Sequence, residues 1–240
     1  AIPVGKLALY TAAAGIHPAQ TLPISLDVGT DNQALLGDDL YLGWRHPRLR
    51  GELYDSLLEE FVQAVRHRFP RAVLQWEDFR KGTAFALMER YKKTLPSFND
   101  DIEGTAAVAV AGMLAAARVS GIPLREQRVV VLGAGAAGVG IGRLVQATLR
   151  RAGLAGDDLF RAVALLDSRG LVVDLEGHGE PFRRSLAWPP ALAERMGLGA
   201  GQAKDLLAVV RAVRPTVLVG VSGAPGSFSE IVVREVASHV

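Results

Sequence analysis

The sequence predicts an α/β fold in which a mostly parallel sheet is covered by helices. Short aliphatic runs alternate along the chain with longer segments that repeat apolar residues at helical spacing. One of these runs leads directly into a glycine-rich turn of the kind that joins a strand to a helix. With 240 residues, the chain is long enough for one large domain or two modest ones.

The first hundred residues are predicted to hold helices and strands of ordinary length. The stripe of apolar residues between Leu53 and Val65, stopped by Pro70, is the clearest helical signal. In chain order, the pattern predicts a helix (5–14), a strand (22–28), a helix (52–69), a strand (72–76), a helix (83–95) and a short strand ending at Asn99.

The second half alternates more regularly, which predicts a Rossmann-type, doubly wound parallel sheet. The pattern predicts an alanine-rich helix (105–120), a strand (128–132), a helix (138–152), a strand (162–166), an irregular Gly- and Pro-rich excursion (177–201), a helix (204–213), a strand (216–220) and a helix from residue 228 onward.

Composition argues against several classes of partner. The 27 basic and 25 acidic residues nearly balance and are scattered, whereas a nucleic-acid-binding protein needs a concentrated basic face. The absence of cysteine excludes disulfides, thiolate metal sites and a cysteine nucleophile. The longest apolar run, residues 106–117, is too short to span a bilayer, and no signal peptide opens the chain. We therefore expect a cytoplasmic protein with neither a membrane nor nucleic acid as partner.

A glycine motif predicts a dinucleotide site. The strand Val129-Val130-Val131-Leu132 runs into G-A-G-A-A-G and then into a helix. In this context Gly133 permits the tight turn, Gly135 lets a pyrophosphate approach the backbone, and Gly138 lets the helix pack closely on the strand. The free N–H groups at the helix start face the phosphates. The predicted loop also includes Ala134, Ala136 and Ala137.

The next strand leads to Asp167, whose carboxylate can accept hydrogen bonds from the adenosine ribose. A carboxylate there repels the extra phosphate of NADP, so NAD is the predicted cofactor, although Arg169 could soften that repulsion. The interval between the glycines and Asp167 is longer than usual, so the first helix and its loop must be extended. A glycine turn that only packs a helix is the alternative.

Two acidic pairs follow predicted strands, Glu77-Asp78 and Asp100-Asp101. The carboxyl ends of strands are where open α/β sheets place their ligands. Carboxylates that meet there repel one another unless a cation joins them, and such hard oxygen ligands suit Mg²⁺ or Mn²⁺. Adjacent acids are also common in solvated loops, so spacing alone leaves both interpretations open.

Four stretches of the chain resemble malic enzymes, in that family's order and with similar separations, and the glycine motif follows where the family has it. The resemblance runs the length of the chain, and Glu103 stands where the family usually has Gln. The stretches are Ile2-Pro3-Val4-Gly5-Lys6-Leu7, Leu26-Asp27-Val28-Gly29-Thr30-Asp31-Asn32, Gln75-Trp76-Glu77-Asp78-Phe79 and Phe98-Asn99-Asp100-Asp101-Ile102-Glu103-Gly104-Thr105-Ala106.

The resemblance implies oxidative decarboxylation of L-malate to pyruvate and CO₂ with reduction of NAD. It implies that Glu77, Asp78 and Asp101 bind the metal, that Lys6 is the general base and that Asp100 tunes it. A metal on the malate hydroxyl eases loss of its proton, and a lysine beside a cation is readily deprotonated and can accept that proton. It further implies a homodimer or homotetramer. Residues 1–101 then form part of a substrate and metal domain, and residues 102–240 an NAD-binding domain truncated at its C-terminus.

The family's tyrosine acid and its malate-gripping arginine lie upstream of the stretch that begins at Ile2, and a Ser-Asn-Pro stretch lies beyond Val240. We therefore expect this chain to be the middle of such an enzyme, able to bind NAD weakly but not to oxidise malate alone. Two alternatives stay open: a malolactic enzyme, which shares the motifs but releases lactate, and a non-catalytic dinucleotide-binding module.

Overall fold

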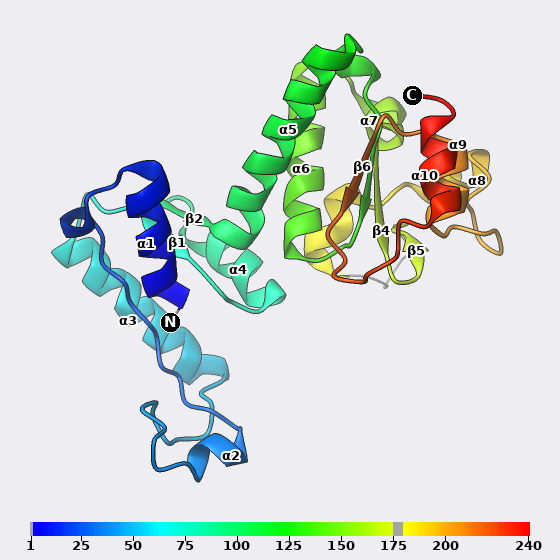
Figure 1. The fold of residues 1–240 in the computed structure, drawn as a ribbon. Coiled ribbons are helices and arrows are strands. Elements are labelled where there is room, and N and C mark those ends of the chain that lie inside the picture. The colour runs from blue at the N-terminus through cyan, green and yellow to red at the C-terminus, as the bar shows by residue number, and fades with distance from the viewer. Residues whose placement is uncertain (1, 175–179) are drawn as a thin grey trace. The chain divides into compact units, whose positions relative to one another are not determined.

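A computed structural model describes residues 2–174 and 180–240 of the chain (Figure 1). The chain divides into two compact units, Ala1–Val73 and Leu74–Val240. This division after Val73 differs from the domain boundary predicted after Asp101, which stays a prediction.

The first unit is built from helices. Its elements are α1 (Ile2–Ala14), η1 (Pro18–Gln20), α2 (Gln33–Leu36) and α3 (Gly51–Arg68). The buried residues of α3, Leu58, Val62 and Val65, follow one another at helical spacing, and the helix ends just before Pro70, which cannot continue it. The two helices predicted here are therefore present, with ends that differ by a few residues.

The strand predicted over residues 22–28 was wrong: the structure has no strand there. Leu22 is 59% exposed and Pro23 has no backbone N–H, so the segment offers neither a buried face nor a complete ladder of donors. The chain is instead tied to residues 46–49 by isolated bonds. The Leu49 N–H donates to the Val28 carbonyl at 2.8 Å, and the Thr30 N–H donates to the His46 carbonyl at 2.9 Å.

The second unit opens with a small β-α-β arrangement. Its elements are β1 (Leu74–Trp76), α4 (Lys81–Tyr91) and β2 (Ser97–Asn99), followed by the π-helical turn η2 (Asp100–Gly104) and the long helix α5 (Thr105–Ser120). β1 and β2 are parallel, with Trp76 opposite Asn99 in the register. Both strands therefore end at the same edge of their sheet, as the sequence predicted.

The rest of the second unit is a four-stranded sheet in the order β5-β4-β3-β6. β3, β4 and β6 are parallel and only the short β5 runs antiparallel. The extra helix α7 lies between α6 and β4, which accounts for the long interval between the glycines and Asp167. The elements are η3 (Leu124–Glu126), β3 (Val129–Leu132), α6 (Ala136–Arg151), α7 (Gly156–Arg161), β4 (Val163–Asp167), β5 (Gly170–Leu171) and β6 (Val217–Gly220).

Helices cover both faces of this sheet, which confirms the predicted fold class (Figure 1). Val129 and Val131 pack in one core cluster with residues of α5 and α6, whereas Val130 packs in another with residues of α9. This alternation of neighbours is the period of two that a strand buried on both faces requires. Two further elements cover the second cluster, α8 (Pro190–Arg195) and α9 (Leu206–Val213). The element η4 (Pro181–Leu186) packs in the first cluster through Phe182 and Leu186, and α10 (Glu230–Ala237) is the last helix.

The excursion predicted as irregular over residues 177–201 contains two short helical elements, η4 and α8. Trp188 anchors this segment, because it is fully buried and its indole N–H donates to the Val163 carbonyl at 2.9 Å. The sequence missed both elements because each is only six residues long and begins at a proline or next to one. Residues 177–179 lie outside the described residues.

One continuous helix, Asp100–Ser120, is long and apolar enough to cross a membrane by length and composition alone. It is longer than the apolar run 106–117, because η2 extends α5 backward by five residues. Ala106, Val110 and Met113 are buried on the face of α5 that packs with α6. The core helix of a globular domain passes the same test, so the test is weak evidence for a membrane span.

Candidate functional site

The glycine loop between β3 and α6 is shaped by close backbone approaches. Gly133 has a φ of +121°, and a β-carbon there would lie 2.7 Å from the Ser222 nitrogen. A β-carbon on Gly138 would overlap the Gly133 carbonyl oxygen. The first glycine thus makes the turn and the last lets α6 start directly against it, which are the uses that the motif predicts.

The start of α6 leaves its backbone donors available. Gly135 is the N-cap residue and provides no side-chain cap. The first N–H groups of a helix have no partner within the helix and attract anions, which the helix dipole reinforces. Ala134, Ala136 and Ala137 carry only methyl groups, so the loop can admit a pyrophosphate to the backbone.

Asp167 ends β4, next to β3 in the sheet. Its side chain is 14% exposed, and one carboxylate oxygen accepts from the Arg183 guanidinium at 3.1 Å. The other oxygen accepts the Arg169 backbone N–H at 2.8 Å. The carboxylate is therefore held in place at the strand end, with two arginines beside it. Arg183 lies sixteen positions further along the chain than Asp167, so its contact with the carboxylate depends on how the intervening segment folds.

A loop that the sequence analysis missed completes this end of the sheet. Residues 222–228, which follow β6, line a groove of about 460 Å³ together with Leu132 and Gly220. The loop begins beside the glycine turn, since the backbone atoms of Val221 and Ser222 together exclude a side chain at Gly133. Its composition, Ser-Gly-Ala-Pro-Gly-Ser-Phe directly after a predicted strand, was the available signal.

The acidic pairs follow β1 and β2 at one edge of the small sheet. Glu77 and Asp78 come directly after β1, and Asp100 and Asp101 begin η2 directly after β2. Asp78 has a φ of +60°, a left-handed conformation that is uncommon for residues other than glycine but that aspartate tolerates better than most. Such conformations cluster at functional sites. Gln75 donates to the Glu77 carboxylate at 3.0 Å.

The η2 turn is fixed by its own side chains. The buried Asn99 accepts the Ile102 N–H at 3.1 Å, and Glu103 accepts the Asn99 N–H at 3.2 Å. This reciprocal pair resembles a capping box and gives Glu103 a defined role at the position where a glutamine was expected. Asp100 lies over Gly104, where a side chain would collide with its carboxylate. Single π-helical turns inside helices are frequent at functional sites.

The structure brings the predicted ligands to one sheet edge but does not gather them into a metal cage. Among the described residues, no group of three His, Asp or Glu side chains is placed to hold a metal ion. The predicted base, Lys6, is half-buried in α1 of the first unit. The roles given to Glu77, Asp78, Asp101, Lys6 and Asp100 therefore stay predictions.

Replacing Gly138 with alanine should damage both the fold and the dinucleotide site. The new methyl group would overlap the Gly133 carbonyl, and relieving such overpacking costs about 1–3 kcal/mol of unfolding free energy. Because α6 must move away from the turn, NAD affinity should also fall by about tenfold or more. Denaturant unfolding and calorimetry with NAD on the full-length protein measure the two effects.

Gly112→Ala is the matched control, since that glycine lies in α5 with nothing within 4 Å of an added β-carbon. It should leave NAD binding unchanged and raise the unfolding free energy by about 0.5–1 kcal/mol, the usual gain for Gly→Ala inside a helix. Equal NAD affinity in the two variants would contradict the role of Gly138.

Comparison with known families matches both parts of the chain. The model described as "Malic enzyme, N-terminal domain" matches residues 1–92, and the model described as "Malic enzyme, NAD binding domain" matches residues 102–240. The glycine loop, Asp167 and the 222–228 loop all lie within the second match, and the acidic pair after β1 lies within the first.

Proteins similar to this chain over nearly its whole length are named as malic enzymes. The chain is 48% identical to a protein named NAD-dependent malic enzyme from Sodalis glossinidius and 48% identical to one of the same name from a Shewanella species (strain MR-4), over 99% of its own length in each case. It spans only 42% of the length of these relatives. Malic enzymes from Entamoeba histolytica and Pyrococcus horikoshii have the same fold, with TM-scores of 0.62 and 0.55. These alignments cover 96% and 94% of this chain and 41% and 43% of theirs, at 19% and 20% identity.

Proposed function

Because the chain belongs to the malic enzyme family, we propose that the protein carrying it oxidises L-malate to pyruvate and CO₂ while reducing NAD. The observation that carries the proposal is the order of the parts. Residues matched by the N-terminal malic enzyme domain precede an NAD-binding domain whose glycine loop has the close backbone packing that dinucleotide binding needs.

The dinucleotide is assigned to the carboxyl end of the Rossmann sheet. The N–H groups at the start of α6 would hold the pyrophosphate, and Asp167 would accept hydrogen bonds from the adenosine ribose. The groove beside residues 222–228 would take the nicotinamide half, since it opens between the ends of β3 and β6.

We assign a divalent metal to Glu77, Asp78 and Asp101. Their oxygen donors suit Mg²⁺ or Mn²⁺, they follow adjacent parallel strands, and the uncommon backbone conformation of Asp78 fits a residue held for function. When bound, such a metal supplies a Lewis acid for the malate hydroxyl and carboxylate oxygens. The three side chains would bind and orient the ion and, through it, the substrate.

Lys6 is proposed to take the malate hydroxyl proton, with Asp100 as its acidic neighbour. A lysine can accept a proton only when its amine is uncharged, and a nearby cation favours that uncharged form. NAD, when bound, would accept the hydride from the same carbon, and the resulting β-keto acid would lose CO₂. The arrangement of Asp100 over Gly104 keeps that carboxylate at the start of η2, one residue from Asp101.

NAD is the proposed cofactor in preference to NADP. Asp167 already carries a negative charge at the strand end, so a 2′-phosphate would meet it directly. Arg183 and Arg169 reduce that repulsion, because both contact the carboxylate. We therefore expect a preference for NAD rather than complete exclusion of NADP.

Turnover of L-malate by the full-length protein tests the function. With malate, Mn²⁺ and NAD, we expect NADH and pyruvate to accumulate in equal amounts, and kcat/KM to be lower with NADP. Lactate without net NADH would favour the malolactic alternative, which shares the motifs. Binding of NAD without any turnover of malate would favour the non-catalytic module.

Two further assignments rest on the sequence and family. We propose that the full-length protein is cytoplasmic and forms a homodimer or homotetramer. Sedimentation of the purified protein measures the assembly, and fractionation of cells measures the location.

A further inference from the structure

Lys81 lies beside the glycine loop although it comes from a distant part of the chain. It is the first residue of α4, just after the acidic pair that follows β1. Its Cε and Nζ atoms each lie 3.5 Å from the point that a β-carbon on Gly135 would occupy. Apart from the chain neighbours of Gly135, nothing else among the described residues comes within 4 Å of that point. The lysine therefore faces the glycine that a pyrophosphate approaches most closely.

The ammonium group of Lys81 has no acidic partner in the part of the chain that the structure describes. It is instead placed at the N-terminal end of α6, a sixteen-residue helix whose dipole is positive at that end. The ammonium group and the helix end are both positive. An anion between them would be attracted by both.

We propose that Lys81 is a ligand of the dinucleotide pyrophosphate, which would lie between its ammonium and the backbone N–H groups of α6. The inference deepens the proposed function, because it rests on NAD binding at this loop. It also places a cofactor ligand close in sequence to the proposed metal site. Asp78, a proposed metal ligand, lies three residues before Lys81, so one short segment would contact both the metal and the cofactor.

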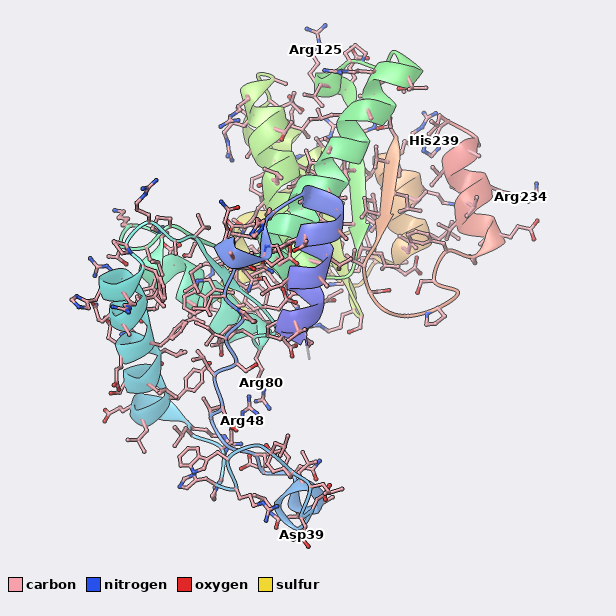
Figure 2. All side chains as sticks on the ribbon, turned by 60° about the vertical axis from the view of Figure 1, so that its left-hand side comes forward. Asp39, Arg48, Arg80, Arg125, Arg234 and His239 are labelled. Atoms are coloured by element: carbon pink, nitrogen blue, oxygen red, sulfur yellow. The ribbon has the colours of Figure 1, made fainter. Side chains whose placement is uncertain are left out.

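Lys81 could not be predicted as part of this site, because the glycine motif contains no basic residue and Lys81 lies 54 positions before Gly135. Only the packing of α4 near the start of α6 brings the two together. Arg80, its neighbour, offers a matched control. It is exposed, it precedes the first turn of α4, and its side chain projects outward (Figure 2).

The test compares Lys81→Gln, Lys81→Arg and Arg80→Gln in the full-length protein by calorimetry. Three probes separate the parts of the ligand: NAD, ADP-ribose, which keeps the pyrophosphate but lacks nicotinamide, and adenosine, which lacks the pyrophosphate. Lys81→Gln should weaken NAD and ADP-ribose by about 10–100-fold, the usual loss for a hydrogen bond to a charged group, and leave adenosine unchanged. Lys81→Arg should keep most of the affinity, and Arg80→Gln should change it less than about twofold.

Salt dependence gives a second readout. The affinity of the unaltered protein for ADP-ribose should fall with ionic strength more steeply than that of Lys81→Gln, since one ion pair is missing in the variant. Unchanged NAD affinity in Lys81→Gln, equal losses for ADP-ribose and adenosine, or an equal loss in Arg80→Gln would each overturn the proposal. If the unaltered protein binds no NAD, the proposed function fails, which is a distinct result from normal NAD binding by Lys81→Gln.

Discussion

Replacing Asp101 with alanine in the full-length protein should abolish malate turnover, and removing divalent metal with EDTA should have the same effect on the unaltered protein. Asp101 starts η2 at the sheet edge where the two strands end, and it is exposed, so its carboxylate is free of core packing. Removing one of the three proposed carboxylate ligands would leave an oxygen site too weak for a divalent cation, and the Lewis-acid contribution of the metal would be lost with it. Steady-state assays across a Mn²⁺ titration measure the loss.

The control for Asp101→Ala is Asp158→Ala, which removes another exposed carboxylate from the same unit. Asp158 lies in α7 and is 78% exposed in an ion pair with Arg161. Exposed pairs of this kind contribute little, so turnover and metal dependence should stay unchanged. The melting temperature of Asp101→Ala should match that of the unaltered protein, because no core contact is removed. Full malate turnover in the presence of EDTA would remove the metal from the mechanism.

The fold was largely predictable because the signals were local. Strands such as residues 129–132 are uninterrupted aliphatic runs, and α3 carries a regular apolar stripe between a glycine and a proline. The strand predicted at residues 22–28 is absent from the structure. Apolar and polar residues alternate there as in a strand, but no neighbouring strand pairs with the segment. The elements β5, α7, η4 and α8 are two to six residues long, too short for any periodicity to reveal.

The parts of the candidate site that belong to a sequence motif could be predicted. The parts that are brought together only by tertiary packing could not. Gly133 and Gly138 were recognisable because close backbone approach demands glycine at fixed spacing. Arg183 beside Asp167, Lys81 beside Gly135 and Ser222 beside Gly133 are all contacts between segments distant in sequence. A single sequence has no local signal for such contacts, so they appear only once the chain is folded.

Replacing Lys6 with alanine in the full-length protein should lower kcat for malate by about 10²–10⁴-fold, the usual contribution of a positioned general base. The substitution leaves the glycine loop and Asp167, the predicted dinucleotide site, unaltered. The affinity for NAD should therefore change little, and calorimetry with NAD beside the kinetic assay separates the two effects.

The pH dependence identifies the role of the amine more directly than the size of the loss. A base works only in its deprotonated form, so kcat of the unaltered protein should rise with pH until the amine is uncharged and then level off. That rising limb should be missing from Lys6→Ala and from Lys6→Met, which keeps an apolar stem of similar length and so preserves the packing of the half-buried side chain. A normal kcat in either variant, or a rising limb that survives the loss of the amine, would show that another group takes the proton.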